Sequence, residues 1–258
     1  GSQQAWVLAQ NVWGRTPLTA NAEPGFTGPM TDPILRGATI AFDLDGTLVD
    51  TAPDLIGALN VVLVQEGLAP VPLAASRRLI GGGALRLVER GFAQAGRPVD
   101  PAQTLAMTDR LVEVYLDRIS QESAPYEGME AALDVLAEGG ATLVVCTNKR
   151  EGLSRTLLEA LGLTGRFAAI VGADSVPDCK PDPGHLRAAI GLGGGDMGRA
   201  LLVGDTETDL KTGRAAGVPV VGVSFGYSET AVEDLGFDRL IHAFAELPAA
   251  AAALLRTV

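Results

Sequence analysis

The pattern of apolar and polar positions from residue 38 onward alternates between two kinds of segment. Short, continuous apolar runs predict strands, and segments in which apolar residues recur every three to four positions predict helices. The expected strands are 40–44, 142–147, 169–172, 200–204, 219–223 and 239–241; the expected helices are 129–137, 151–161, 185–190, 209–216 and 247–255. Because neighbouring parallel strands need a crossover connection, this alternation predicts an α/β fold with a Rossmann-like parallel sheet core.

Residues 53–124 interrupt this alternation with helical patterns alone. The expected helices are 53–67, 74–80, 84–94 and 101–119. Pro53 suits a first helical turn, and Asp100 before Pro101 is a typical helix start. Four helices without a strand predict a separate small helical domain inserted into the core. The expected division is therefore a core of residues 36–52 and 125–258 with an insertion of residues 53–124.

Residues 1–35 show no sustained period and are rich in Gly, Pro, Thr, Gln and Asn. Gly1-Ser2 is typical of a pair left by a tag. The stretch is expected to be an N-terminal arm, either flexible or packed through Trp6 and Trp13 on the body or on a second subunit. A homodimer is thus one of the open alternatives.

Composition and charge narrow the class of protein. Hydrophobic residues make up 47% of the chain, enough for a core, and the net charge of -11 argues against nucleic acid or an anionic membrane as partner. No apolar run approaches the roughly 20 residues that span a bilayer, and no leader pattern opens the chain, so a cytoplasmic location is expected. Cys146 and Cys179 are expected to be reduced thiols, with Cys146 filling strand volume.

The first expected strand ends in two carboxylates, Asp43 and Asp45. Side chains alternate along a strand, so both would project to the same side, roughly 6.6 Å apart. Two acids that close repel one another unless a cation lies between them, and Mg²⁺ prefers carboxylate, water and phosphate oxygens. Gly46 then allows a sharp turn. The stretch predicts a Mg²⁺ cofactor.

This stretch and three later ones resemble the haloacid dehalogenase superfamily, whose signature is DxDGT, then Thr or Ser, then Lys, then GDxxxD. The corresponding residues here are Asp43-Leu44-Asp45-Gly46-Thr47, Thr147-Asn148, Lys180-Pro181, and Gly204-Asp205 with Asp209. They occur in the family's order and fall after expected strands, where ligands of α/β folds gather. The resemblance spans residue 38 to the C-terminus, and it implies that residues 53–124 form a cap over an active site.

The chemistry expected of such a site is hydrolysis of a small phosphorylated substrate. Asp43, ionised at neutral pH, would attack phosphorus and form an aspartyl-phosphate, and Asp45 would act as general acid and base. The metal residues implied by the resemblance are Asp43, Asp45 through its carbonyl, Asp205 and Asp209. For Asp209 two roles are open, support of the metal through water or orientation of Lys180. The expected phosphate-binding residues are Thr147, Asn148 and Lys180.

Each of these residues has an ordinary structural alternative when considered alone. Asp209 could be a helix cap, Lys180 a solvated loop lysine and Thr147 a turn residue; their joint order favours function. His185 and His242 match no catalytic or metal spacing and are expected to be structural. Gly81-Gly82-Gly83 follows no strand and is expected to be a helix–helix hinge rather than a phosphate cradle.

The substrate class follows from absences and from local strings. Residues 51–124 contain no lysine, which counts against the similar phosphonoacetaldehyde hydrolases, and DTAPDLIGAL lacks the histidine of the β-phosphoglucomutases. The strings FDLDGTLVDTAPDL, IGGGALRLVERG, CTNK, CKPDP, VGDTETD and FGYSE are similar to bacterial phosphoglycolate phosphatases, which implies a small phosphorylated carboxylic acid.

The expected cap contains two arginines that could bind substrate and is bounded by two expected hinges. Arg86 and Arg90, four residues apart, are candidates for the substrate carboxylate or for cap closure, with a solvated basic face as the alternative. Hinges are expected at residues 50–53 and 124–127. The alternatives for function are a phosphatase for a sugar phosphate, nucleotide or pyrophosphate, and a non-catalytic binding module on the same fold.

Overall fold

A six-stranded parallel sheet lies at the centre of the computed structural model, which describes residues 33–257. The strand order is β5-β4-β1-β6-β7-β8. The bounds are β1 Thr39–Phe42, β4 Thr142–Cys146, β5 Ala169–Val171, β6 Ala200–Gly204, β7 Val220–Val223 and β8 Arg239–Ile241. Thr39 is opposite both Thr142 and Ala200, so β1 lies between β4 and β6. The predicted α/β fold with a parallel sheet is confirmed.

Helices cover both faces of the sheet, which explains why its strands read as continuous apolar runs. Ile40 and Phe42 of β1 belong to one apolar cluster, and Ala41 between them belongs to a second. Helices α5 and α10 pack with the first cluster and α7 with the second, where α8 contacts α7. The bounds are α5 Met129–Glu138, α6 Glu151–Ala160, α7 Pro183–Leu192, α8 Glu207–Ala216, α9 Val232–Leu235 and α10 Leu247–Leu255. Cys146 lies in the second cluster, as predicted.

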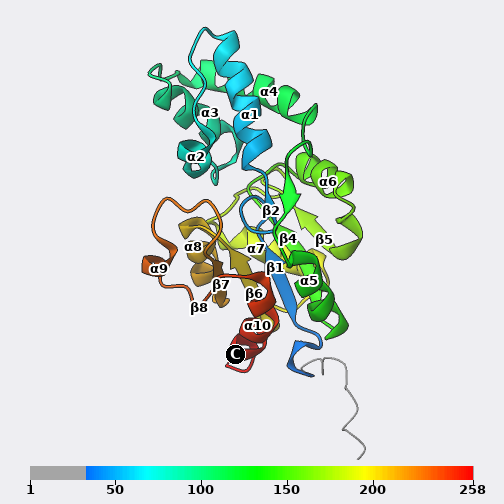
Figure 1. Ribbon diagram of the computed structural model, residues 1–258. Helices are drawn as coiled ribbons and strands as arrows, with labels where there is room; N and C mark the ends of the chain where they lie inside the picture. Colours follow the sequence, from blue (N-terminus) through cyan, green and yellow to red (C-terminus); the bar gives the residue numbers. More distant parts are fainter. Residues whose placement is uncertain (1–32, 258) are drawn as a thin grey trace, which may run out of the picture. The chain divides into compact units, whose positions relative to one another are not determined.

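Residues between the short antiparallel strands β2 (Val49–Asp50) and β3 (Ala124–Pro125) form only helices. They are α1 Ala52–Gln65, α2 Leu73–Ser76, α3 Gly83–Gln94 and α4 Pro101–Leu116, which Figure 1 shows in one group. Helix α4 packs against both α1 and α3. In the part of the chain that the structure describes, no helix combines the length and apolarity needed to cross a membrane.

Several boundaries differ from those expected, each for a local reason. The helix expected over 74–80 is the four-residue α2 followed by a 3₁₀ turn, Arg77–Leu79. Helix α7 begins earlier than expected because Asp182 accepts a hydrogen bond from Gly184 N–H at 2.7 Å and caps it. Strands β2 and β3 were missed because two residues show no period. Of the predicted arm, residues 1–32 lie outside the described residues, and Pro33–Leu35 form a 3₁₀ turn.

Asp54, in the first turn of α1, anchors the return of the chain from the helical segment. Its buried Oδ2 accepts hydrogen bonds from Glu122 N–H at 3.0 Å, Ser123 N–H at 2.8 Å and the Ser123 hydroxyl at 2.7 Å. Arg118 Nε lies 3.4 Å from its Oδ1. One carboxylate therefore ties both ends of the helical segment together.

We expect Asp54→Ala to lower the free energy of unfolding by about 3 kcal/mol, because it leaves buried donors and a partly buried guanidinium without their acceptor. Chemical denaturation measures this. Asp109→Ala, which removes an exposed carboxylate from α4, is the matched control and should stay within about 0.5 kcal/mol of the wild type. Equal, small effects of both substitutions would contradict the anchoring role.

Candidate active site

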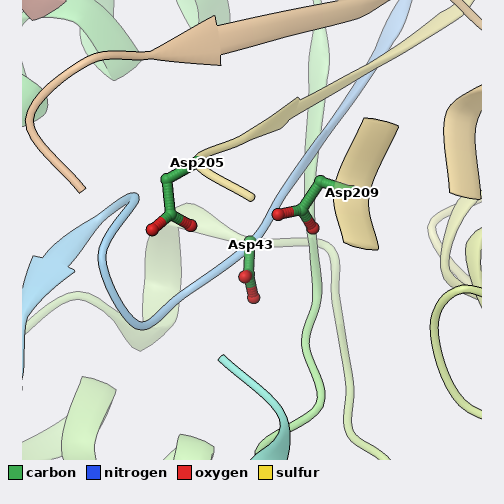
Figure 2. A group of neighbouring side chains, drawn as sticks. All are labelled: Asp43, Asp205 and Asp209. Atoms are coloured by element: carbon green, nitrogen blue, oxygen red, sulfur yellow. The ribbon is translucent and has the colours of Figure 1, made fainter. Parts of the chain in front are cut away.

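Three carboxylates meet at the carboxyl ends of the central strands. Asp43 directly follows β1, Asp205 directly follows β6, and Asp209 lies in the first turn of α8. Because β1 and β6 are parallel neighbours, the residues after them emerge at the same edge of the sheet. One oxygen from each carboxylate lies within 4.8 Å of those from the other two, and all three residues are buried. Figure 2 shows these side chains gathered from their three segments.

Asp43 is held by its own backbone and by Lys180. Its Oδ1 accepts a hydrogen bond from Leu44 N–H at 2.7 Å and lies 3.0 Å from Lys180 Nζ. Burial raises the pKa of Asp43 to about 6; the Lys180 ammonium lowers it, whereas the charges of Asp209 and Asp45 raise it. Burial and like charges together thus oppose ionisation of Asp43 and favour the approach of a cation.

Asp205 is fully buried and is held by two hydrogen bonds. Its Oδ2 accepts a hydrogen bond from Tyr227 N–H at 2.7 Å and its Oδ1 from the Thr47 hydroxyl at 3.1 Å. Gly46, with φ +84°, lies so close that a Cβ there would be 2.5 Å from Asp205 Oδ2. Burial, and then the charges of the other two carboxylates, raise the pKa of Asp205 well above its ordinary value.

Asp209 connects the cluster to Lys180 and to the start of α8. Its Oδ1 lies 2.6 Å from Lys180 Nζ, while its Oδ2 accepts hydrogen bonds from the backbone N–H and the hydroxyl of Thr206 at 3.1 and 2.8 Å. Burial alone would lower the pKa of Lys180, but the carboxylates of Asp209 and Asp43 outweigh it and raise that pKa. The close pairing of Asp209 Oδ1 with the Lys180 ammonium favours orientation of Lys180 over direct metal ligation.

The loop that carries Lys180 is fixed by two further side chains. The Lys180 N–H donates to His185 Nδ1 at 3.1 Å, and His185 Nε2 lies 3.2 Å from the Val171 carbonyl. Burial, and then the Lys180 charge, lower the pKa of His185 to about 4, so the ring is neutral. Asn148 Nδ2 donates to the Lys180 carbonyl at 2.9 Å. His185 is therefore structural, as predicted, and it positions the lysine backbone.

The charges of this cluster fit a divalent cation. When ionised, the three buried carboxylates carry two more negative charges than the Lys180 ammonium beside them balances. Carboxylate oxygens are the ligands that hard cations such as Mg²⁺ take. Asp43 and Asp205 are the candidates to ligate such an ion, because the donors to Asp205 are the neutral groups of Thr47 and Tyr227 and the contact of Asp43 with Lys180 is made through Oδ1.

Asp45 lies outside this cluster and forms a second ion pair. Its Oδ1 accepts from the Thr51 hydroxyl at 2.8 Å, and Lys149 Nζ lies 3.0 and 3.3 Å from its two oxygens. The Lys149 ammonium also lies 4.4 Å from the centre of the Tyr115 ring of α4. The acid predicted to act on the leaving group is thus held between the sheet and the helical segment.

A cavity of about 220 Å³ lies over these residues. Asp43, Asp45, Lys149 and Lys180 line its polar side, and α1, α3, α4 and the Gly81–Gly83 turn line its other side, chiefly with apolar residues. Sites for drug-sized ligands start at roughly 300 Å³. The enclosed space therefore suits a small polar ligand.

Arg86 and Arg90, the candidates for substrate binding or cap closure, have partners elsewhere. Arg86 pairs with Glu89 at 3.1 Å, and Arg90 pairs with Glu229 at 2.5 Å. Neither is among the residues that line the cavity. The Arg90–Glu229 pair joins α3 to the loop after β7, which fits the alternative of holding the helical segment against the core.

Comparison with known proteins places this geometry in a family. Residues 40–223 match the model of the haloacid dehalogenase-like hydrolases. The chain belongs to this family. A phosphoglycolate phosphatase of Caulobacter vibrioides is 53% identical over 221 residues, covering 86% of this chain and 93% of the relative. One from Mesorhizobium japonicum is 46% identical, covering 76% and 86%. This haloacid dehalogenase-like hydrolase is therefore similar to phosphoglycolate phosphatases over most of its length.

A solved structure agrees with the sequence comparison. The crystal structure of a predicted phosphoglycolate phosphatase from Haemophilus somnus superposes with a TM-score of 0.76 at 27% identity. The match covers 84% of this chain and 98% of that one. The parallel sheet and the helical segment of this haloacid dehalogenase-like hydrolase thus have a counterpart of nearly the same extent.

The structure brings together most of the residues that the family signature marks. Asp43, Asp205, Asp209 and Lys180 form one cluster. Thr147 is buried after β4, with its hydroxyl oxygen accepting from Lys149 N–H at 3.2 Å. The roles predicted for these residues, including phosphate binding by Thr147 and Asn148, stay predictions.

Sequence reasoning missed three residues of this site: Lys149, Tyr115 and Tyr227. Lys149 and Tyr227 lie within CTNK and FGYSE, two strings whose resemblance to the phosphoglycolate phosphatases does not single out any one residue. The chain contains just three lysines, Lys149, Lys180 and Lys211, so Lys149 could have been singled out by rarity. Tyr115 gave no signal, because its partner is far away in sequence.

Divalent cations are expected to bind more tightly as pH rises. The pKa of Asp43 is near 4 in the unfolded chain and about 6 in the folded protein. Ionisation of Asp43 therefore lowers the stability of the folded protein as the pH rises through this range. A bound divalent cation offsets this loss of stability, but at pH values below the pKa it must compete with protons for the carboxylate. The rise in Tm caused by Mg²⁺ should therefore be larger at about pH 8 than at about pH 5.

Calorimetry with and without Mg²⁺ measures this difference. Asp205→Asn, which removes one carboxylate while keeping the shape, should lose most of the Mg²⁺-dependent rise in Tm. Asp109→Asn on the exposed face of α4 is the control and should retain it. A rise that is independent of pH, or one that survives Asp205→Asn, would contradict an ion in this cluster.

Proposed function

We propose that this chain is a Mg²⁺-dependent phosphoglycolate phosphatase that works through a phosphorylated Asp43. One observation carries the proposal: Asp43 borders the cavity while its carboxylate contacts Lys180 and belongs to a cluster with unbalanced negative charge. A nucleophile, a phosphate-binding cation and metal ligands are thus combined at one point. The names of the similar phosphatases support the same substrate.

The metal would be held by Asp43, Asp205 and the backbone carbonyl of Asp45, with Asp209 supporting it indirectly through Lys180. Bound Mg²⁺ would offset the negative charge of the phosphate and align it with the nucleophile. Lys180 Nζ, 3.0 Å from Asp43, is placed to meet a non-bridging phosphate oxygen. The Thr147 hydroxyl and Asn148, which follow β4 at the same edge, would bind the remaining oxygens.

Catalysis would proceed in two displacements. In the first, an Asp43 oxygen forms a bond to phosphorus, the bond to the ester oxygen breaks, and Asp45, which must carry a proton when the substrate binds, gives that proton to the departing alkoxide. In the second, Asp45 takes a proton from water, the water oxygen attacks phosphorus, and the bond to Asp43 breaks. Phosphate leaves and both aspartates return to their starting state. Lys149 and Thr51 orient the carboxylate of Asp45 for both transfers.

The helical segment would act as a cap that opens to admit the substrate. Its helices supply apolar residues to the cavity that Asp43 borders. The proposed hinges are residues 50–53 and 124–127, where β2 and β3 pair. Arg77 reaches Asp50 with two hydrogen bonds of 3.0 and 2.8 Å, and would hold the cap closed. The core of residues 36–52 and 125–258 would stay fixed.

We expect Asp43→Asn to reduce turnover by roughly 10⁴-fold or more, because an amide cannot form the acyl-phosphate intermediate. The fold should persist, since the buried cluster already disfavours ionised Asp43. Steady-state assays with circular dichroism measure both properties, and Asp109→Asn is the control. Activity within tenfold of the wild type in Asp43→Asn would refute the covalent route.

A panel of phosphomonoesters assayed with Mg²⁺ should show the highest kcat/KM for 2-phosphoglycolate. Larger esters, such as nucleoside monophosphates and hexose phosphates, should be poorer substrates because the cavity of about 220 Å³ does not enclose them. Equal rates on all esters, or a preference for a hexose phosphate, would leave a phosphatase but remove phosphoglycolate as its substrate.

A further inference from the structure

Two of the three lysines of this chain lie buried in one cavity, and the proposed mechanism uses only one of them to bind substrate. Lys180, with a side chain 1% exposed, is held between Asp43 and Asp209 on the side of the carboxylate cluster. Lys149, with a side chain 5% exposed, lies at Asp45 and faces the helical segment. Burying an ammonium is costly, so each is expected to have a specific anionic partner.

Lys149 has room for a second anion. An ammonium carries three donors; the two hydrogen bonds of Lys149 Nζ at 3.0 and 3.3 Å both go to the carboxylate of Asp45, and its other polar neighbour is the uncharged Tyr115 hydroxyl. Lys180 demonstrates what such a lysine can hold, because its Nζ contacts two carboxylates at 3.0 and 2.6 Å. Lys149 contacts one carboxylate where Lys180 contacts two, so it could bind a second.

A second donor without a partner lies beside Lys149. Tyr115 of α4 is 1% exposed and borders the cavity, and among the described residues its hydroxyl, which lies near the Lys149 ammonium, has no acceptor for its proton. Burial raises the pKa of Tyr115 to about 12, so the hydroxyl keeps its proton at neutral pH. Buried hydroxyls are usually paired, and one that is not paired calls for a ligand.

We propose that Lys149 and Tyr115 form the subsite that binds the carboxylate of the substrate. The inference rests on the proposed function and names the residues that would make the enzyme specific for a small carboxylated phosphomonoester. In such a substrate the second anion is close to the phosphate, so its partner must border the same small cavity. Arg86 and Arg90 do not border it, and Arg150, which does, is exposed.

The subsite also explains how a carboxylate would be distinguished from an uncharged group. Apolar residues Leu55, Ile80 and Leu111 line the cavity near the helical segment and offer no alternative hydrogen bonds. An ester without a carboxylate would leave the Tyr115 hydroxyl and a donor of Lys149 unpaired in a dry site, which is the condition for strong discrimination. Because Lys149 follows β4 and Tyr115 belongs to α4, the subsite is complete only when the helical segment lies against the core.

Comparison of two substrates isolates this role. kcat and KM are measured for 2-phosphoglycolate and for ethyl phosphate, which has the same phosphate and lacks the carboxylate. Lys149 contacts Asp45, so Lys149→Met will alter catalysis of both esters, but an effect through Asp45 cancels in the ratio of the two kcat/KM values. We expect the ratio to fall on the order of 10- to 100-fold, mainly through KM for phosphoglycolate.

Tyr115→Phe provides a second variant that keeps the ring against Lys149 and removes only the hydroxyl; we expect the ratio to fall roughly tenfold. Lys211→Met is the matched control, because Lys211 is exposed on α8 and pairs with Glu207, and its ratio should equal that of the wild type. A wild-type preference for phosphoglycolate that survives both substitutions would overturn the subsite and leave the proposed function standing. A wild type without that preference would overturn the substrate and the subsite together.

Discussion

The constraint on which this structure depends is the burial of three carboxylates around one ammonium at the end of a parallel sheet. The topology makes the cluster unavoidable, because β1 and β6 are neighbours and each is followed directly by an aspartate. Lys180 balances one charge, and hydrogen bonds from Leu44, Thr47 and Tyr227 partly replace lost hydration. The remaining imbalance is the feature on which the proposed binding of a divalent ion rests.

The same interactions extend to the base of the helical segment. The Tyr227 N–H donates to Asp205, its hydroxyl donates to Asp50 at 2.7 Å, and the Ala52 N–H at the start of α1 donates to that hydroxyl oxygen at 2.9 Å. Asp50 in turn binds Arg77 of the helical segment through both oxygens. A single tyrosine therefore lies between the carboxylate cluster and the strand from which α1 emerges, and both are positioned together.

The sequence was sufficient for the sheet and for the cluster, and insufficient for what completes the site. Strands buried on both faces produce continuous apolar runs, so β1, β4 and β6 were predicted closely, and the signature residues follow them. The sequence pattern did not indicate Lys149, Tyr115 or Tyr227. Each contacts a partner that is distant in the chain, and such a contact produces no local periodicity. Strands β2 and β3 escaped for another reason: two residues cannot show alternation.

The two buried lysines differ in what holds them in place. Lys180 is fixed on all sides by core residues: carboxylates hold its ammonium, and His185 and Asn148 hold its backbone. Lys149 is fixed by Asp45 on one side only, and its other neighbour is the Tyr115 ring of the helical segment. Groups that act on phosphorus need constant geometry, whereas groups that sense the rest of a substrate gain selectivity when the substrate must complete them. The placement of the lysines meets both demands.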